Sequence, residues 1–188
     1  MANQIRVGAP LKSTGGLLAG ALDTPLPTDA STPLDEALVA LGLLGEDGLQ
    51  ETENRSTDEV RVWGGGLGRV LQTEWGIQLT FTFMETSTAV LKEVRGEDNV
   101  SEKPSTTSGK TLRTTMRNSK VLPPRVYVAE IKDGNNHIRK VYPQAQITEV
   151  GDVTYSHNDT IKYEVTLSCY EDENGNAEYE YEEYETAA

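Results

Sequence analysis

The sequence has little of what reactive or membrane-embedded proteins need. Its 188 residues include one cysteine, Cys169, so no disulfide can form within the chain. Because Cys169 lies in an alternating apolar run, we expect it to be a buried small hydrophobe. No apolar run approaches the roughly 20 residues of a membrane helix, and no basic stretch followed by an apolar segment resembles a secretion signal. We therefore expect a chain made and folded in a reducing cytoplasm, without a membrane partner.

Groups that could carry chemistry are equally scarce. The two histidines, His137 and His157, fall in predicted turns as lone, exposed side chains, without the spacing of a catalytic triad or a metal site. The glycine-rich stretch 64–68 precedes a predicted strand rather than a helix and lacks the lysine of a phosphate-binding loop. We predict no catalytic residue, no cofactor and no metal, and hence a protein that is not an enzyme.

Positive charge is in short supply, and it is unevenly distributed. The net charge is −13, which does not attract the phosphate backbone of nucleic acids. Residues 103–125 carry six basic side chains and no acidic one, whereas residues 171–188 carry eight acidic side chains and no basic one. Opposite fields of this kind can guide assembly. Our hypothesis is that the two segments approach each other, within one chain or between copies; the alternative is two independently solvated surfaces.

The N-terminal residues 1–30 are rich in proline and glycine but also hold many apolar side chains. A free disordered tail would have fewer. We predict an extended arm that becomes ordered against another copy of the chain, with a disordered leader as the alternative.

Two short amphipathic helices are expected. The first covers Pro33–Leu41, with Thr32 as its N-cap and Gly42 at its end. The second covers Ser87–Arg95 and stops at Gly96.

Most of the remaining chain alternates between apolar and polar residues, which predicts strands with one face in the core. The expected strands are 43–46 and 49–56 as a hairpin, 59–63, 69–74 and 77–85 as a pair or one bent strand, 125–132 and 137–142 as a hairpin, 144–150, 160–170 and 177–185, with a polar loop or hairpin over 96–118. The sequence thus predicts a mainly β protein, a sandwich or barrel of antiparallel strands with one or two short flanking α-helices. Its expected organisation is an arm (1–30), a β domain (31–170) with a polar and basic insertion (97–123), and an acidic C-terminal arm (171–188).

Several runs in a fixed order resemble the major tail tube proteins of long-tailed, siphovirus-type phages of actinobacteria. These runs are Leu26–Asp35, Leu43–Leu49, Arg61–Gly65, Thr80–Thr86, Gln146–Asp152 and Tyr163–Tyr170. The resemblance implies a fold shared with type VI secretion tube proteins, and rings of six subunits whose inner sheets join into one barrel. It implies that rings stack into a tube in the virion tail and that the genome passes through the lumen during ejection. The implied partners are further copies of the chain, the tape measure protein and viral DNA in the lumen, and the tail terminator and distal tail proteins at the ends.

A tube of this kind needs an inner surface that does not hold DNA. Rings of lysine or arginine would bind phosphates, whereas hydroxyls, amides and acids would not. The candidate lumen-lining residues are Gln78, Thr80, Thr82, Gln146, Thr148, Glu164, Thr166 and Ser168. Lys162 departs from this pattern and is assigned to a ring boundary. For each set the alternative is an outer surface.

Contacts between subunits are expected from the apolar arm and from the two charged segments. The candidates are Ile5, Val7, Leu17, Leu18, Leu22, Arg113, Arg117, Lys120, Glu180, Glu182 and Glu183. Two other functions stay open: another virion structural protein, such as a capsid decoration or head–tail joining protein, and an adhesin-like binding module.

Overall fold

The computed structural model describes residues 5–12 and 15–184. In this part of the chain, nine strands form one antiparallel sheet and two further strands form a small separate sheet. The large sheet contains β1 (Ala9–Pro10), β2 (Leu17–Gly20), β3 (Val39–Ala40), β4 (Gln50–Arg61), β5 (Leu67–Phe83), β8 (Arg125–Asp133), β9 (Asn136–Val150), β10 (Tyr163–Cys169) and β11 (Tyr179–Glu183). The small sheet pairs β6 (Val100–Pro104) with β7 (Thr111–Thr115), and α1 (Thr88–Arg95) leads through a short 3-10 helix, Glu97–Asn99, into β6. The prediction of a mainly β protein with antiparallel strands is confirmed.

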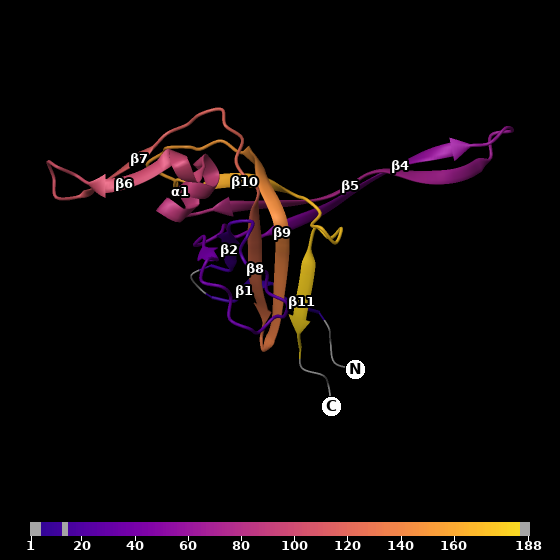
Figure 1. Cartoon of the computed structure of the whole chain (residues 1–188), viewed down its shortest axis with the longest axis horizontal. Helices are drawn as coiled ribbons and strands as arrows, with labels where there is room; N and C mark the ends of the chain where they lie inside the picture. The colour runs from indigo at the N-terminus through magenta and orange to yellow at the C-terminus, as the bar shows by residue number, and fades with distance from the viewer. Residues whose placement is uncertain (1–4, 13–14, 185–188) are drawn as a thin grey trace.

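The long strand β9 joins two parts of the large sheet. Its first half pairs with β11 on one side and β8 on the other, and its second half pairs with β10. From β10 the sheet continues through β5 to β4, and from β8 it continues through β2 to β3. Figure 1 shows β8 and the first half of β9 crossing the direction of β5 and β10, so the sheet bends at β9.

The core fills the angle of this bend. Alternate residues of β5 and β10 are fully buried there, among them Leu79, Phe83 and Leu167. The helix α1 packs over them with Val90 and Val94. Predicted as Ser87–Arg95, this helix is confirmed: the Ser87 hydroxyl accepts a hydrogen bond from the Val90 amide, and Gly96 ends the helix.

The Ser87 cap makes a measurable contribution to stability. Replacing Ser87 by Ala is expected to lower the free energy of unfolding by about 1 kcal/mol, because the Val90 amide then lacks its hydrogen-bond acceptor at this half-buried helix end. Urea denaturation measures the change. Thr86→Ala, one residue outside the cap, is the matched control, and equal effects of the two changes would contradict the assignment.

The predicted helix over Pro33–Leu41 is wrong. The segment is a series of turns followed by β3, because short polar side chains bind the backbone locally instead. The carboxylate of Asp29 accepts hydrogen bonds from two following amides, and that of Asp35 accepts one from the Ala37 amide. The apolar side chains still reach a core, since Leu38 packs against Val126 and Val141.

The predicted hairpin between 43–46 and 49–56 is also wrong. Strand β4 does start near the expected place, but its partner is β5 over its whole length. Residues 43–45 instead run along the end of β5, where the Gly45 amide donates to the Thr82 carbonyl. The segments 69–74 and 77–85 form the single strand β5, the second of the two arrangements expected.

The N-terminal segment belongs to the sheet of its own chain. Both β1 and β2 pair with β8, and the neighbouring turn around Asp29 is held by the buried side chain of Arg139. Its guanidinium donates to the Asp29 carbonyl at 2.8 Å and the Thr32 carbonyl at 3.0 Å, and forms an ion pair with Glu130, which is also buried. His137 is half-buried with Nε2 3.2 Å from the Glu130 carboxylate, which corrects the expectation of an exposed side chain.

Candidate functional site

The register of the sheet brings all eight predicted lumen-lining residues onto one face. Strand β10 lies between β5 and β9, with Glu164 opposite Thr82, Thr166 opposite Thr80, and Ser168 opposite both Gln78 and Gln146. Thr148 completes the set, with its hydroxyl 3.3 Å from the Thr166 carbonyl and 3.4 Å from the Ser168 hydroxyl. We call this surface the polar face. Its side chains are exposed or half-buried.

Sequence analysis missed the contribution of β4 to the polar face. Gln50 lies opposite Thr80, Thr52 opposite Gln78, and the Asn54 amide donates to Gln78 at 3.3 Å. The error followed from pairing this segment with 43–46 rather than with β5. A signal was available, because residues 50–59 contain no apolar side chain and so cannot alternate with a core.

Acidic groups also join the polar face. Glu149 lies opposite Thr166, and Glu74 lies opposite Ser56. Together with Glu164 they make the face negative. Its members on β4 and β5 include no lysine or arginine, because Arg55 alternates onto the other side of the sheet, opposite Trp75. A surface of this composition offers phosphate groups no cationic partner.

Two lysines lie at the margins of this face. Lys162 precedes β10 and forms an ion pair with Asp159 at 3.2 Å, and this hydrogen bond lowers the pKa of the Asp159 carboxyl. Lys120 lines a shallow hollow next to Gln146 and Thr148, beside the outer edge of β9. Cations therefore border the polar face without interrupting it.

The predicted inter-subunit residues separate into two groups. Leu17 is 1% exposed and lies in the core of its own chain, and Leu18 is half-buried against the second apolar cluster. Ile5 and Val7 are 81% and 66% exposed, and Leu22 is exposed as well. This second group has the larger apolar surface to offer to a neighbour.

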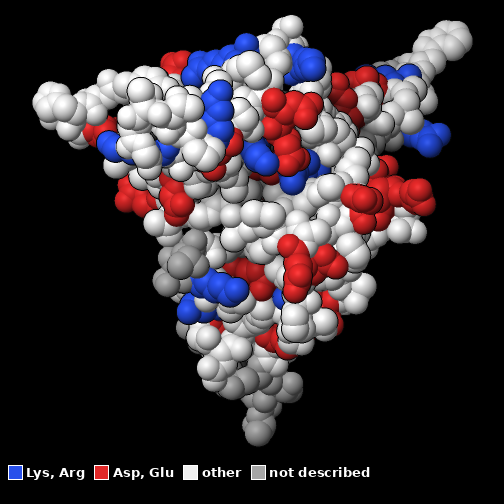
Figure 2. Space-filling view, turned by 60° about the vertical axis from the view of Figure 1, so that its left-hand side comes forward, with Lys and Arg blue, Asp and Glu red and all other residues white. Residues whose placement is uncertain are grey.

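The two charged segments have separate partners within the chain. Glu180 pairs with Lys140, and Glu182 pairs with Arg6. Arg113 approaches Glu102 at 3.9 Å, while Arg117 and Lys120 are exposed, as is Glu183. Figure 2 shows lysine and arginine side chains gathered across the upper part of one face, at the level of α1, β6 and β7. These ion pairs therefore do not join the basic segment to the acidic segment of the same chain. Contact between the two segments of different copies remains a prediction.

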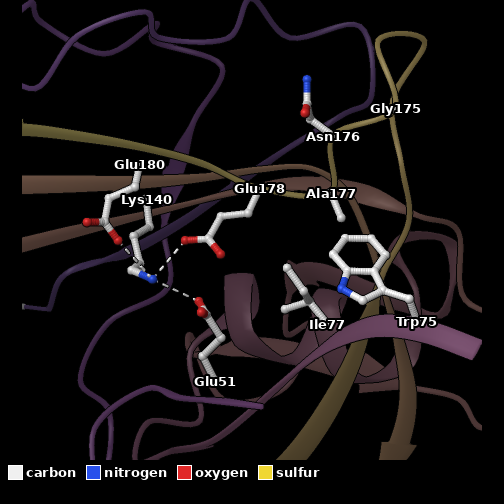
Figure 3. Close-up of a pocket in the computed structure, with 9 residues that line it drawn as sticks. All are labelled: Glu51, Trp75, Ile77, Lys140, Gly175, Asn176, Ala177, Glu178 and Glu180. Carbon is white, nitrogen blue, oxygen red and sulfur yellow. Dashed lines mark hydrogen bonds and ion pairs between the residues drawn. The ribbon is translucent and has the colours of Figure 1, made fainter. Parts of the chain in front are cut away.

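An open hollow of about 520 Å³ lies where β11 meets β4 and β9 (Figure 3). Lys140 lines one side of it, with Nζ 3.0 Å from Glu51, 2.7 Å from Glu178 and 3.2 Å from Glu180. Although partial burial opposes it, hydrogen bonds to Glu178 and Glu51 raise the pKa of Lys140. Because Lys140 forms ion pairs with all three carboxylates, it connects β11 and the residue before it to β4 and β9. None of these three carboxylates is therefore left unpaired to act with the lysine as an acid–base pair.

A long hairpin leaves the body of the molecule at one end of its longest axis (Figure 1). It consists of β4 and the first half of β5, and each residue from Gln50 to Glu74 is exposed. At its tip the Val62 amide donates to the Gly66 carbonyl and the Gly65 amide to the Val62 carbonyl. Gly64 and Gly65 have φ of +102° and +84°, which only glycine adopts readily. This turn presents Trp63 entirely to solvent, at 105% relative exposure.

Reactive constellations do not form among the described residues. Over 5–12 and 15–184, no three histidine, cysteine or carboxylate side chains come together as metal ligands. Cys169 is buried, and burial raises the pKa of its thiol to about 12. In the same part of the chain, no helix has the length and apolar character to cross a membrane.

Comparisons with known proteins identify the family. The model of a family described as "Phage tail tube protein" matches residues 2–186. Comparison with curated proteins finds no match. Among solved structures, the chain is similar to one from the sheath–tube complex of an extracellular contractile injection system in its extended state, with 9% identity over 91% of this chain and 90% of that one and a TM-score of 0.47. It is also similar to one from the cap that terminates the tube of the anti-feeding prophage, with 10% identity over 96% of both chains and a TM-score of 0.44. Because the family match spans nearly all of the sequence, the chain belongs to the phage tail tube protein family.

Proposed function

We propose that this tail tube protein forms rings of six copies that stack into the tail tube of a siphovirus-type phage, with a polar to acidic lumen through which the genome passes. Membership of the family makes the chain a structural component of the phage tail, and hence of the virion, rather than an enzyme. The observation that carries the finer proposal is the polar face, to which four neighbouring strands contribute hydroxyls, amides and carboxylates.

The edges of this four-stranded part of the sheet support a closed ring. On one side, β4 is the terminal strand of the order β9-β10-β5-β4. On the other side, β8 pairs with β9 only as far as Ala145. Residues 146–150 of β9 thus pair with β10 along one edge, and no described strand pairs with their other edge. Unpaired edges bind other strands, and closure into a barrel satisfies them. In the proposed ring, β4 of each copy pairs with the end of β9 in the next copy, and the polar faces become the inner wall.

The inner wall would repel DNA rather than bind it. Each copy contributes Glu74, Glu149 and Glu164 to the polar face, and a ring multiplies these charges. Proteins bind DNA largely because their lysine and arginine side chains displace counterions from the phosphates. A negative wall with few cations displaces none, so contact with it does not stabilise the DNA. The tape measure protein before ejection, and the terminator and distal proteins at the ends, are the further partners proposed.

Between copies, the exposed members of the arm and of the charged segments are proposed as contacts. They are Ile5, Val7, Leu22, Arg113, Arg117, Lys120 and Glu183. Leu18 is half-buried, and Glu180 and Glu182 already have ion-pair partners in their own chain, so these three are proposed as secondary contributors.

Negative-stain electron microscopy of the purified chain tests the proposal. We expect hollow rings or tubes, with six-fold symmetry in end-on views. A capsid decoration protein would stay a monomer or trimer, and a head–tail joining protein would give rings that do not stack. Either result at concentrations up to the solubility limit would contradict the proposed function.

A further inference from the structure

The tip of the β4–β5 hairpin exposes an apolar surface to solvent. Beside Trp63, it exposes the side chains of Val60, Val62, Leu67 and Val70, each at 45–56%. An isolated two-stranded hairpin is at best marginally stable in water. Exposed apolar patches on such an element mark a surface that another protein covers.

A hollow of about 400 Å³ has matching character. It lies between β1, the end of β8 and the segment 44–49, and its apolar lining includes Pro10, Leu44, Leu49 and Ile131. This volume is in the range that holds a single large side chain or a small ligand. Glu46 also lines the hollow and Asp47 is adjacent, whereas the hairpin tip carries the exposed Arg69. The two surfaces therefore match in apolar character, and Arg69 offers one cation to the acidic rim of the hollow.

The tip and the hollow lie at opposite ends of the long strand β5. The hairpin projects from one end of the longest axis (Figure 1), while β5 ends on the other side, near α1. The segment that borders the hollow is fixed at that far end of β5, since Leu44 pairs with Phe83 and Gly45 binds Thr82. A contact between surfaces at opposite ends joins copies head to tail and can repeat without limit.

We propose that Trp63 of one copy inserts into the hollow between β1 and residues 44–49 of a copy in the adjacent ring. This inference rests on the proposed function, because it names the contact that stacks the rings. Tryptophan is enriched among the residues that dominate protein interfaces, and it buries roughly 150–250 Å² when it docks. Two backbone hydrogen bonds close the turn around Gly64 and Gly65, which limits the conformational entropy that the tip loses on docking.

Replacing Trp63 by Ala separates stacking from ring formation. We expect Trp63→Ala to form rings as the wild type does but to raise the protein concentration needed for tubes by roughly 30-fold or more, the change typical of a dominant interface residue. Trp63→Phe should form tubes at a concentration between those needed by the wild type and by Trp63→Ala. Tubes of normal length and threshold with Trp63→Ala would overturn the inference while leaving the proposed function intact. A wild-type chain that forms neither rings nor tubes would contradict the proposed function and, with it, this contact.

Engineered cysteines identify the docking partner. Gly66→Cys leaves Trp63 in place, because a Cβ at position 66 meets only Val62 at 3.5 Å, and Asp47→Cys lies beside the hollow. Oxidation of tubes of the double variant should give a ladder of disulfide-linked chains, since each copy supplies one tip and one hollow. The native Cys169 is buried with its thiol pKa raised to about 12, so it stays inert.

The matched control pairs Gly66→Cys with Glu173→Cys, which places the second thiol in the exposed turn before β11. We expect no ladder from this control. A ladder from the control, or only dimers from the variant with Asp47→Cys, would show that the tip docks elsewhere and would overturn the inference.

Discussion

Replacing Arg139 by Met is expected to lower the free energy of unfolding by about 3–5 kcal/mol. The side chain is 2% exposed, and its loss leaves the buried carboxylate of Glu130 without its cation. The carbonyls of Asp29 and Thr32 lose their hydrogen-bond donor at the same time. Urea denaturation of the unassembled chain, followed by circular dichroism, measures the change.

The double variant Arg139→Met with Glu130→Leu is the matched control. Removing both charges of a buried pair is often close to neutral, because the desolvation cost of each charge disappears with it. We expect the double variant to recover most of the lost stability. A single variant that loses less than about 1 kcal/mol, the value of an exposed pair, would show that solvent reaches this site.

Replacing Thr166 by Lys is expected to turn a tube that does not bind DNA into one that does. Thr166 lies in the middle of the polar face, opposite both Thr80 and Glu149. Six copies per proposed ring would supply six cations at one level of the lumen. Contact with 6–10 phosphates makes affinity fall by roughly 10³–10⁵ between 50 and 200 mM salt.

Tubes assembled in the presence of a short DNA duplex and then sedimented test this expectation. The Thr166→Lys tubes should retain DNA at low salt and release it over the range just given, whereas wild-type tubes retain none at either salt concentration. Thr111→Lys, in β7 outside the four-stranded part of the sheet, is the matched control and should behave as the wild type does. Equal retention by the two variants would show that the polar face is not the inner wall.

Alternation of residue types was sufficient to predict most strands and one complete surface. In β10, Val165 and Leu167 face the core while Thr166 and Ser168 face away, and β5 repeats this pattern. The hydrophobic effect fixes which face is buried, so the polar residues of three strands could be assigned to a common face before their pairing was known. The helix α1 was predictable because its cap and its stop signal both lie in the sequence.

Pairing between distant segments was not predictable in the same way. Local pattern suggested a hairpin at Asp47-Gly48, and Gly48 does have a positive φ of +66°, but the strand that follows pairs with β5 instead of the preceding residues. The apolar spacing of residues 34–41 favoured a helix, yet hydrogen bonds that backbone amides donate to the carboxylates of Asp29 and Asp35 stabilised turns. The Arg139–Glu130 pair gave no signal, because nothing local distinguishes a buried charge from an exposed one on a strand.

The long β4–β5 hairpin gives the molecule a direction, because the other end of its longest axis carries the shorter β6–β7 hairpin instead (Figure 1). In the proposed ring, six tryptophan-tipped hairpins would project from one rim and not from the other, so the two rims would be chemically unlike. A filament of such rings would have a polarity, and its two ends would elongate by different reactions. The proteins proposed to close the two ends would then face different tasks: one would receive six β4–β5 tips, and the other would fill six empty hollows.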